Sequence, residues 1–164
     1  MEQEPISRIA IRRKNTMRNI LFSVLMVGLS AGLAIAFTDT ENAWYQALVL
    51  SPLQPPGWVF RAIWSAVYFI LAATLFFLLQ QGVRGRTLYA YLVNLALLPL
   101  WNYLFFATRN PVAAMLVLLL SLVSSIAMAI TSFFHNRWIS LALLPYVLWL
   151  GYALVLNYAV VMLN

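Results

Sequence analysis

Five long apolar runs, separated by short polar turns, constrain the fold of this chain more than any other feature. The runs cover about residues 19–37, 59–79, 87–107, 111–134 and 138–163. A helix needs roughly 20 apolar residues to cross the hydrocarbon core of a bilayer, so each run is long enough for one span. Because the turns between the last four runs are short, these helices must lie antiparallel to their neighbours. The sequence therefore predicts an all-α integral membrane bundle of five transmembrane helices.

The composition agrees with a membrane protein and leaves no room for a soluble domain. Of the 164 residues, 64% are hydrophobic and only 9% are charged, which is too little polar surface to cover a soluble globule. The chain has no cysteine, so disulfides, thiolate metal sites and a cysteine nucleophile are excluded.

Basic residues set the expected orientation of the bundle. Residues 1–18 form a basic arm that contains Arg8, Arg12, Arg13, Lys14 and Arg18. Lys and Arg in short loops stay on the cytoplasmic side, which predicts a cytoplasmic N-terminus in a bacterial inner membrane. The arm accompanies no folded domain, so we expect it to contact anionic membrane lipids and do not expect a nucleic-acid partner.

Titratable groups are scarce where catalysis would need them. No Asp, Glu or Lys falls inside a predicted span, and His135 is the only histidine. Acid–base catalysis and metal binding both require such groups to be held together in one site. We therefore expect no catalytic residue, no metal site and no cofactor.

The segment 38–58, between the first two spans, combines restricted backbone with aromatic side chains. Its prolines are Pro52, Pro55 and Pro56, and they limit the conformations open to the loop. Its aromatic residues lead into the second span, where Trp64 and Tyr68 share one helix face. This pattern predicts a lid over a flat hydrophobic ligand.

Two helical spacings allow both packing and binding interpretations. In the last span Tyr146, Trp149, Ala153 and Asn157 form one stripe, in which the small Ala153 leaves space between aromatic walls. The same stripe is typical of an ordinary helix crossing. In the first span, Gly28-x3-Gly32 permits close helix approach; we favour packing within the chain over a dimer seam.

Three ordered blocks of residues resemble the tryptophan-rich sensory protein, or translocator protein, family over about Met17 to Asn164. The blocks are Trp44-Tyr45 with Pro52, Pro55, Pro56, Trp58, Phe60, Trp64 and Tyr68; Asn94 with Trp101, Phe105 and Phe106; and Pro145-Tyr146 with Trp149, Ala153, Leu156 and Asn157. The resemblance implies a five-helix bundle, often dimeric. It also implies a pocket, closed by the first loop, for porphyrins, other tetrapyrroles and, in some members, cholesterol.

The resemblance also implies a set of ligand-binding residues. By matching motif positions these are Tyr45, Pro55, Trp64, Tyr68, Asn94, Trp101, Phe105, Trp149, Ala153 and Leu156. Planar macrocycles gain from aromatic stacking and apolar burial, and an indole N–H or an Asn amide can fix a ligand carbonyl or carboxylate.

The third span departs from the family pattern at one position. Leu98 occupies a site where the family usually carries an Asn, so one ligand-orienting hydrogen bond is expected to be missing. Pro99 follows it, and its missing N–H frees a backbone carbonyl and favours a bend in this span.

These observations lead to one principal hypothesis and two alternatives. The principal one is a membrane protein that binds a porphyrin or other tetrapyrrole for sensing, sequestration or transport, as a homodimer or as a subunit of a larger membrane complex. The first alternative, favoured by Leu98, is a structural accessory subunit of a larger, for example pigment-containing, complex. The second is tryptophan-assisted photodegradation of a bound porphyrin.

Overall fold

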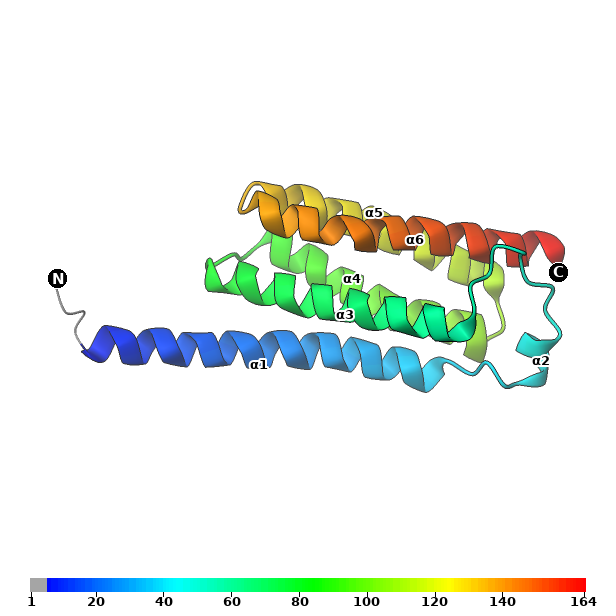
Figure 1. The fold of residues 1–164 in the computed structure, drawn as a ribbon, viewed down its shortest axis with the longest axis horizontal. Helices are drawn as coiled ribbons and strands as arrows, with labels where there is room; N and C mark the ends of the chain where they lie inside the picture. The colour runs from blue at the N-terminus through cyan, green and yellow to red at the C-terminus, as the bar shows by residue number, and fades with distance from the viewer. Residues whose placement is uncertain (1–5) are drawn as a thin grey trace.

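The computed structural model describes the backbone of residues 6–164 and the side chains of residues 15–164. The elements are α1 Ile6–Phe37, α2 Ala43–Gln46, α3 Gly57–Gln80, α4 Arg86–Asn102, the π-helical turn η1 Tyr103–Ala107, α5 Pro111–Phe133 and α6 Arg137–Leu163 (Figure 1). Residues 6–164 contain no strand. Five of the helices are long and apolar enough to cross a membrane, which confirms the predicted all-α bundle.

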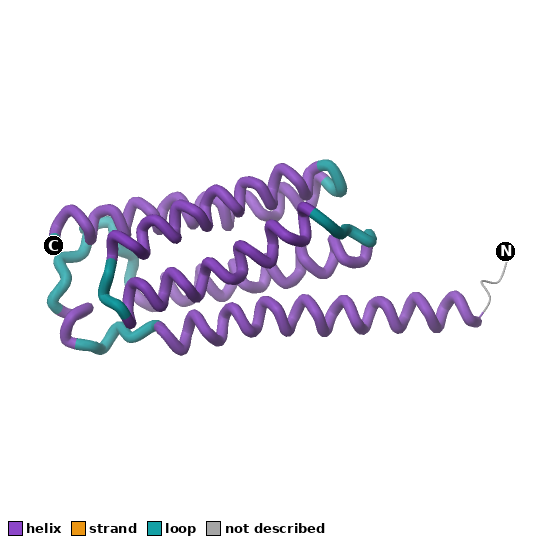
Figure 2. The backbone as a smooth tube through the Cα atoms, turned by 180° about the vertical axis from the view of Figure 1, so that it is seen from behind, coloured by secondary structure: helices purple, strands orange, loops and turns teal. Residues whose placement is uncertain are grey.

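The five long helices form a ring in which each contacts two neighbours. Around this ring the order is α1, α3, α6, α5 and α4, and α4 closes it against α1. The lid with α2 lies at the same end as the C-terminus, and the N-terminal part of α1 projects beyond the other helices at the opposite end (Figures 1 and 2). Residues 1–5 of the expected basic arm lie outside the described residues, while residues 6–18 continue α1.

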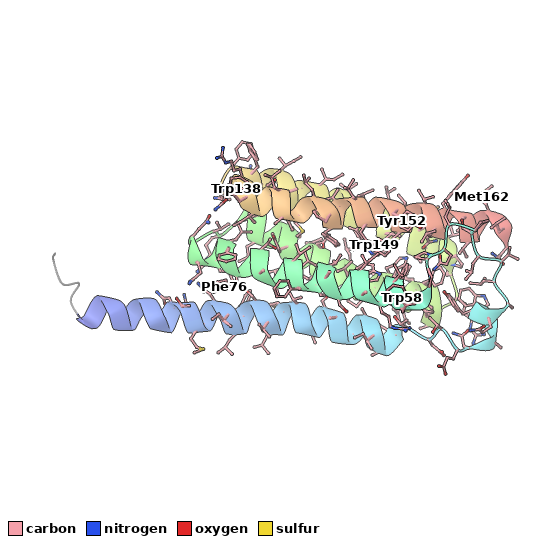
Figure 3. All side chains as sticks on the ribbon, in the orientation of Figure 1. Trp58, Phe76, Trp138, Trp149, Tyr152 and Met162 are labelled. Atoms are coloured by element: carbon pink, nitrogen blue, oxygen red, sulfur yellow. The ribbon has the colours of Figure 1, made fainter. Side chains whose placement is uncertain are left out.

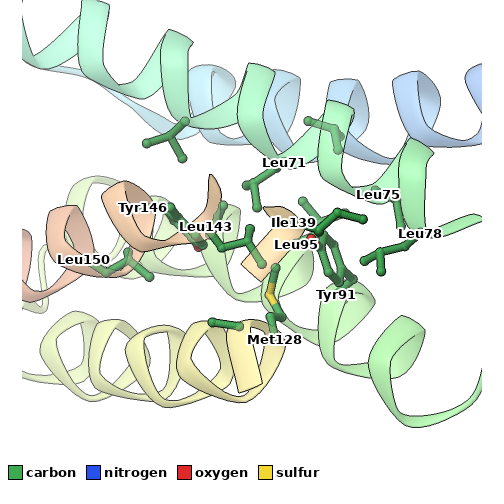
Figure 4. Close-up of a cluster of buried hydrophobic side chains, with 14 of the residues drawn as sticks. Leu71, Leu75, Leu78, Tyr91, Leu95, Met128, Ile139, Leu143, Tyr146 and Leu150 are labelled. Atoms are coloured by element: carbon green, nitrogen blue, oxygen red, sulfur yellow. The ribbon is translucent and has the colours of Figure 1, made fainter. Parts of the chain in front are cut away.

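The centre of the ring is filled by large apolar side chains (Figure 4). The most deeply buried come from four of the helices: Leu71, Leu75, Leu78, Tyr91, Leu98, Leu118, Met128, Leu143, Tyr146 and Leu150. Leu98 is therefore part of the packed core, where an Asn amide would need a hydrogen-bonding partner.

The turns between helices are specified by residues that end or begin helices. Gly82 and Gly85 adopt positive φ angles of 73° and 67°, which glycine tolerates without steric cost. The side chain of Asn110 caps α5 by accepting from the Ala113 amide, and Asn136 caps α6 in the same way. Short, capped turns of this kind hold consecutive helices antiparallel.

Pro99 interrupts the hydrogen bonding of α4, as the sequence predicts. Proline has no N–H, so the carbonyl of Leu95 loses its partner within the helix. The hydroxyl of Ser30 in α1 donates to that carbonyl at 2.7 Å. The helix continues past Asn102 as the π-helical turn η1, where the Thr108 amide donates to the Tyr103 carbonyl at 3.0 Å. The freed carbonyl thus becomes a link between α1 and α4.

Replacing Ser30 with alanine should destabilise the bundle by about 1 kcal/mol, because the Leu95 carbonyl would then be buried without a donor. The measurement is the midpoint of unfolding in a detergent titration followed by circular dichroism. Ser65→Ala is the matched control, since the exposed Ser65 hydroxyl donates only to its own helix at the Arg61 carbonyl.

Pro99→Ala provides the second arm of this test. It restores an N–H for the Leu95 carbonyl, so Ser30→Ala should cost clearly less in the Pro99→Ala background. An equal cost in both backgrounds would show that the Ser30 hydroxyl stabilises the protein by some other route.

The two glycines of α1 face out of the bundle. No atom of the described residues beyond their own local helix lies within 4 Å of a Cβ built on Gly28 or Gly32. The prediction that these glycines serve close packing within the chain is therefore wrong. The side of α1 that packs into the bundle carries Ser23, Val27 and Ser30 instead.

Candidate functional site

The first half of the lid is shaped by short-range hydrogen bonds. The carboxylate of Asp39 accepts from the amides of Glu41 and Asn42, and the Asn42 side chain in turn accepts from the Tyr45 amide at 2.8 Å. Asn42 is thereby the N-cap of the short helix α2. The sequence between α1 and the prolines is thus locally ordered before it meets the bundle.

Aromatic packing docks this half of the lid onto the bundle. Trp44 and Tyr45 pack against Phe105 and Phe106, with ring centroids 5.6 Å apart for Trp44 and Phe105 and 5.4 Å apart for Tyr45 and Phe106. We call this group the lid cluster; it also contains Leu48, Leu50, Trp101, Leu104, Ala114 and Val160. Burial raises the pKa of the Tyr45 hydroxyl above its ordinary value, so the phenol stays neutral.

Helix α6 holds the lid at two further points. The side chain of Asn164 accepts from the Val49 amide at 3.0 Å and donates to the Val49 carbonyl at 3.2 Å. Nearer the start of α3, the hydroxyl of Tyr152 donates to the carbonyl of Leu53. The second half of the lid is therefore joined to α6 and to the residue after it at two points, Val49 and Leu53.

A groove of about 490 Å³ lies between α3 and α6, beside the lid. Its walls are Pro55 from the lid, Val59 and Ile63 from α3, and Pro145, Leu148, Trp149 and Tyr152 from α6. Figure 3 shows Trp149 and Tyr152 on α6 at the level where the lid meets α3. Leu148 is 74% exposed, so in a bilayer this groove opens sideways to the lipid.

Behind the groove stands a wall of aromatic rings. The Trp149 ring lies 5.3 Å from Phe60, 6.3 Å from Trp64 and 5.5 Å from Tyr152. Trp64 in turn lies 5.9 Å from Tyr68, one turn further along α3. The Trp149 side chain is nine-tenths buried, and its indole Nε1 has no hydrogen-bond partner. A buried N–H without an acceptor costs free energy, and a ligand oxygen or nitrogen would relieve that cost.

The other predicted aromatic residues of α4 and η1 lie in the lid cluster, away from the groove lining. Trp101 stacks on Phe105 at 5.4 Å, and its Nε1 donates to the Asn157 side chain at 2.9 Å. Asn157 also donates to the Pro111 carbonyl, so it joins three helical segments. The indole N–H of Trp101 thus already has a partner, in contrast to that of Trp149.

Asn94 is completely buried at the meeting point of three helices. Its Nδ2 donates to the Ser121 carbonyl at 3.0 Å and to the Ser124 hydroxyl at 2.6 Å. Its Oδ1 accepts from the Tyr146 hydroxyl at 2.6 Å. These three bonds join α4 to α5 and α6 and use both ends of the amide.

The structure thus brings together four of the predicted ligand residues and separates the others. Pro55 and Trp149 line the groove, and Trp64 and Tyr68 form the aromatic wall behind it. Tyr45, Trp101 and Phe105 belong to the lid cluster. Ala153 and Leu156 are buried in α6, and Asn94 joins helices.

Several groove residues were missed from the sequence, although a helical signal for them exists. Leu148 and Tyr152 follow Pro145 at i+3 and i+7, which places all three on one face of α6 next to the predicted Trp149. The predicted stripe shares Trp149 with this face but otherwise runs through Tyr146, Ala153 and Asn157, which are buried in the core. Periodicity alone does not distinguish a core face from a groove face in a helix that is apolar all round.

Polar chemistry is otherwise sparse in the part of the chain that the structure describes. Within it, no three His, Cys, Asp or Glu side chains are grouped so that they could hold a metal ion. Of the residues that line the groove, only Tyr152 and Trp149 carry a polar side-chain group, and the indole N–H of Trp149 is buried. The arrangement is suited to burying one face of a flat apolar molecule.

Comparison with known proteins gives a consistent result over nearly the whole chain. The sequence model of the TspO/MBR family matches residues 20–163. The chain is 32% identical to the Tryptophan-rich protein TspO of Archaeoglobus fulgidus over 149 residues, which cover 88% of this chain and 96% of that protein. It is 32% identical to the Protein CrtK of Rhodobacter capsulatus, covering 88% and 92%. It is 31% identical to the Translocator protein of Bos taurus, covering 82% and 83%.

Proposed function

The chain belongs to the TspO/MBR family, and from that premise we propose that it binds a flat hydrophobic ligand, a porphyrin or another tetrapyrrole, in the groove between α3 and α6. Binding would serve sensing, sequestration or transport of the ligand. Family membership and the five apolar helices make it a multi-pass membrane protein. The site of this proposal is the apolar groove beside the lid.

The unpartnered indole N–H of Trp149 is the observation that carries the proposal. A donor that is buried among aromatic rings and has no acceptor is uncommon in a folded protein. Because the neighbouring rings cover Nε1, a planar ligand would bring an acceptor to it only as the Trp149 ring or a ring beside it turns; the ligand would bury an apolar face against Val59 and Ile63. The groove has a volume of about 490 Å³ and is open on one side, so one face of a ligand would contact the protein and the other the surrounding lipid.

The lateral opening of the groove suits a ligand that is dissolved in the bilayer. Such a molecule reaches the groove between α3 and α6 without crossing an aqueous phase. The proposed cytoplasmic position of the N-terminus would place the lid and the groove toward the outer leaflet. No charged residue lines the groove, so a charged edge of the ligand would have to project toward the headgroups.

Titration of protoporphyrin IX against the protein in nanodiscs tests this proposal through quenching of tryptophan fluorescence. The wild type should show saturable quenching. Trp149→Phe should weaken the affinity about 5- to 10-fold, since it keeps an aromatic ring and removes the unpartnered donor beside the groove, worth about 1 kcal/mol. Trp138→Phe is the matched control, because Trp138 lies exposed at the opposite end of α6 and packs on Arg137.

Two outcomes would count against the proposal. Quenching that never saturates, with equal strength in all three proteins, would favour the accessory-subunit interpretation. Equal affinities for the wild type and Trp149→Phe would show that the orphan N–H is not the anchor of the ligand.

A further inference from the structure

The two halves of the lid are held to the bundle in different ways. Residues 43–50 are packed into the lid cluster and are fixed by the two hydrogen bonds between Asn164 and Val49. Residues 51–56 belong to neither of the buried apolar clusters. Their connection to α6 is the hydrogen bond from the Tyr152 hydroxyl to the Leu53 carbonyl. One half is therefore docked by aromatic packing, whereas the other is joined to α3 through the Pro56 carbonyl and has the Tyr152 hydroxyl as its hydrogen-bonding partner on α6.

The lightly held half is internally stiff. Three of its six residues are prolines, whose φ angles are restricted. A turn closes it, in which the Gln54 amide donates to the Ser51 carbonyl at 2.9 Å and the Leu53 amide donates to the Ser51 hydroxyl at 3.1 Å. The prolines restrict residues 52–56, whereas rotation at Ser51 breaks both hydrogen bonds of the turn, so exchange of the Leu53 and Gln54 amides reports movement at this position.

We propose that residues 51–56 form a flap that opens over the groove while residues 43–50 stay docked, and that Tyr152 is the latch of this flap. The proposal rests on the proposed ligand-binding function for its biological role. It divides the lid into a fixed part and a moving part, with the hinge near Ser51.

Tyr152 is placed to connect the state of the flap with the occupancy of the groove. Its ring lines the groove, and its hydroxyl holds the flap at Leu53. Pro55, two residues further along the flap, lines the same groove. A ligand in the groove therefore contacts both the latch residue and the flap, and it stabilises the latched state by touching both.

Hydrogen exchange of the protein in nanodiscs without ligand tests the flap directly. Tyr152→Phe removes the latch hydroxyl and keeps the ring, so exchange at the Leu53 and Gln54 amides should rise roughly 3- to 10-fold, as expected for the loss of one hydrogen bond. Exchange in residues 43–48 should not change. Asn164→Ala is the matched control: it removes two lid-to-α6 hydrogen bonds in the docked half and should leave Leu53 and Gln54 unaffected.

Two exchange results would overturn the proposal. If Tyr152→Phe raises exchange over the whole of residues 43–56, the lid moves as one body. If it leaves Leu53 and Gln54 unchanged, the tyrosine hydroxyl is not a latch.

A kinetic experiment tests the effect of the flap on ligand exchange. Protoporphyrin IX is bound to each protein and then chased with an excess of empty liposomes. Its dissociation should be roughly 3- to 10-fold faster from Tyr152→Phe than from the wild type, and unchanged for Asn164→Ala. Equal dissociation rates would contradict the latch. If protoporphyrin IX binds none of the proteins while the hydrogen-exchange pattern is as expected, the proposal of the flap is supported and the proposed ligand-binding function is contradicted.

Discussion

Asn94→Ala is expected to lower the free energy of unfolding by about 2–3 kcal/mol, because it removes three hydrogen bonds that join α4 to α5 and α6. It also leaves the Tyr146 hydroxyl buried without an acceptor. The measurement is unfolding in a detergent titration followed by circular dichroism. Asn102→Ala is the matched control on the same helix, since the Asn102 amide donates to its own helix at Leu98 and accepts from Thr38 near the surface.

Asn94 can either join helices or bind the ligand, and a double-mutant cycle together with a binding measurement separates these two roles. Tyr146→Phe removes one of the three hydrogen bonds, so combining it with Asn94→Ala should cost less than the sum of the two single changes. For Asn94→Ala alone we expect a large loss of stability. Its affinity for protoporphyrin IX should change only as a consequence of the loosened helix packing. An unchanged stability together with a lost affinity would instead assign Asn94 to the ligand, as the family resemblance implies.

The five helices were predictable because membrane spans depend on residue type more than on arrangement. A run of about 20 apolar residues has few alternatives to a transmembrane helix. The short turns then restrict the order of neighbours. Pro99 was also predictable in its local effect, because the loss of its N–H follows from its chemistry alone. What the sequence did not identify was the partner of the freed carbonyl, Ser30, which lies 65 residues away from Leu95.

The candidate site was predictable in its residue types and less so in its geometry. The prolines and aromatic residues of segment 38–58 predicted a lid, and the structure folds this segment against the bundle. The ties to α6 join residues that are 99 and 115 positions apart, so no local pattern reveals them. The free N–H of Trp149 and the bonded N–H of Trp101 are likewise indistinguishable in the sequence, because they depend on what each indole meets across the helix interface.

The groove itself is best tested by filling it from α3. Val59 and Ile63 lie one turn apart on α3 and both line the groove, and neither belongs to the fully buried core. Val59→Trp combined with Ile63→Trp places two large rings in the space where the ligand would stack, and it removes no side-chain hydrogen bond because valine and isoleucine side chains form none. We expect the affinity for protoporphyrin IX to fall at least about 30-fold, equivalent to about 2 kcal/mol.

The matched control is Ser65→Trp combined with Phe69→Trp. These two positions are also one turn apart on α3, and both side chains are exposed away from the groove. The control variant gains tryptophans on the same helix and at the same spacing. It should bind protoporphyrin IX with the affinity of the wild type.

The most direct test of the account is an absorbance titration of protoporphyrin IX against the wild type, the groove-filled variant and the control variant in nanodiscs. The Soret band should shift saturably with the wild type and the control, and the shift should be lost in the Val59→Trp, Ile63→Trp variant. A saturable shift of equal affinity in all three proteins would show that the ligand binds elsewhere and would contradict the assignment of the groove between α3 and α6.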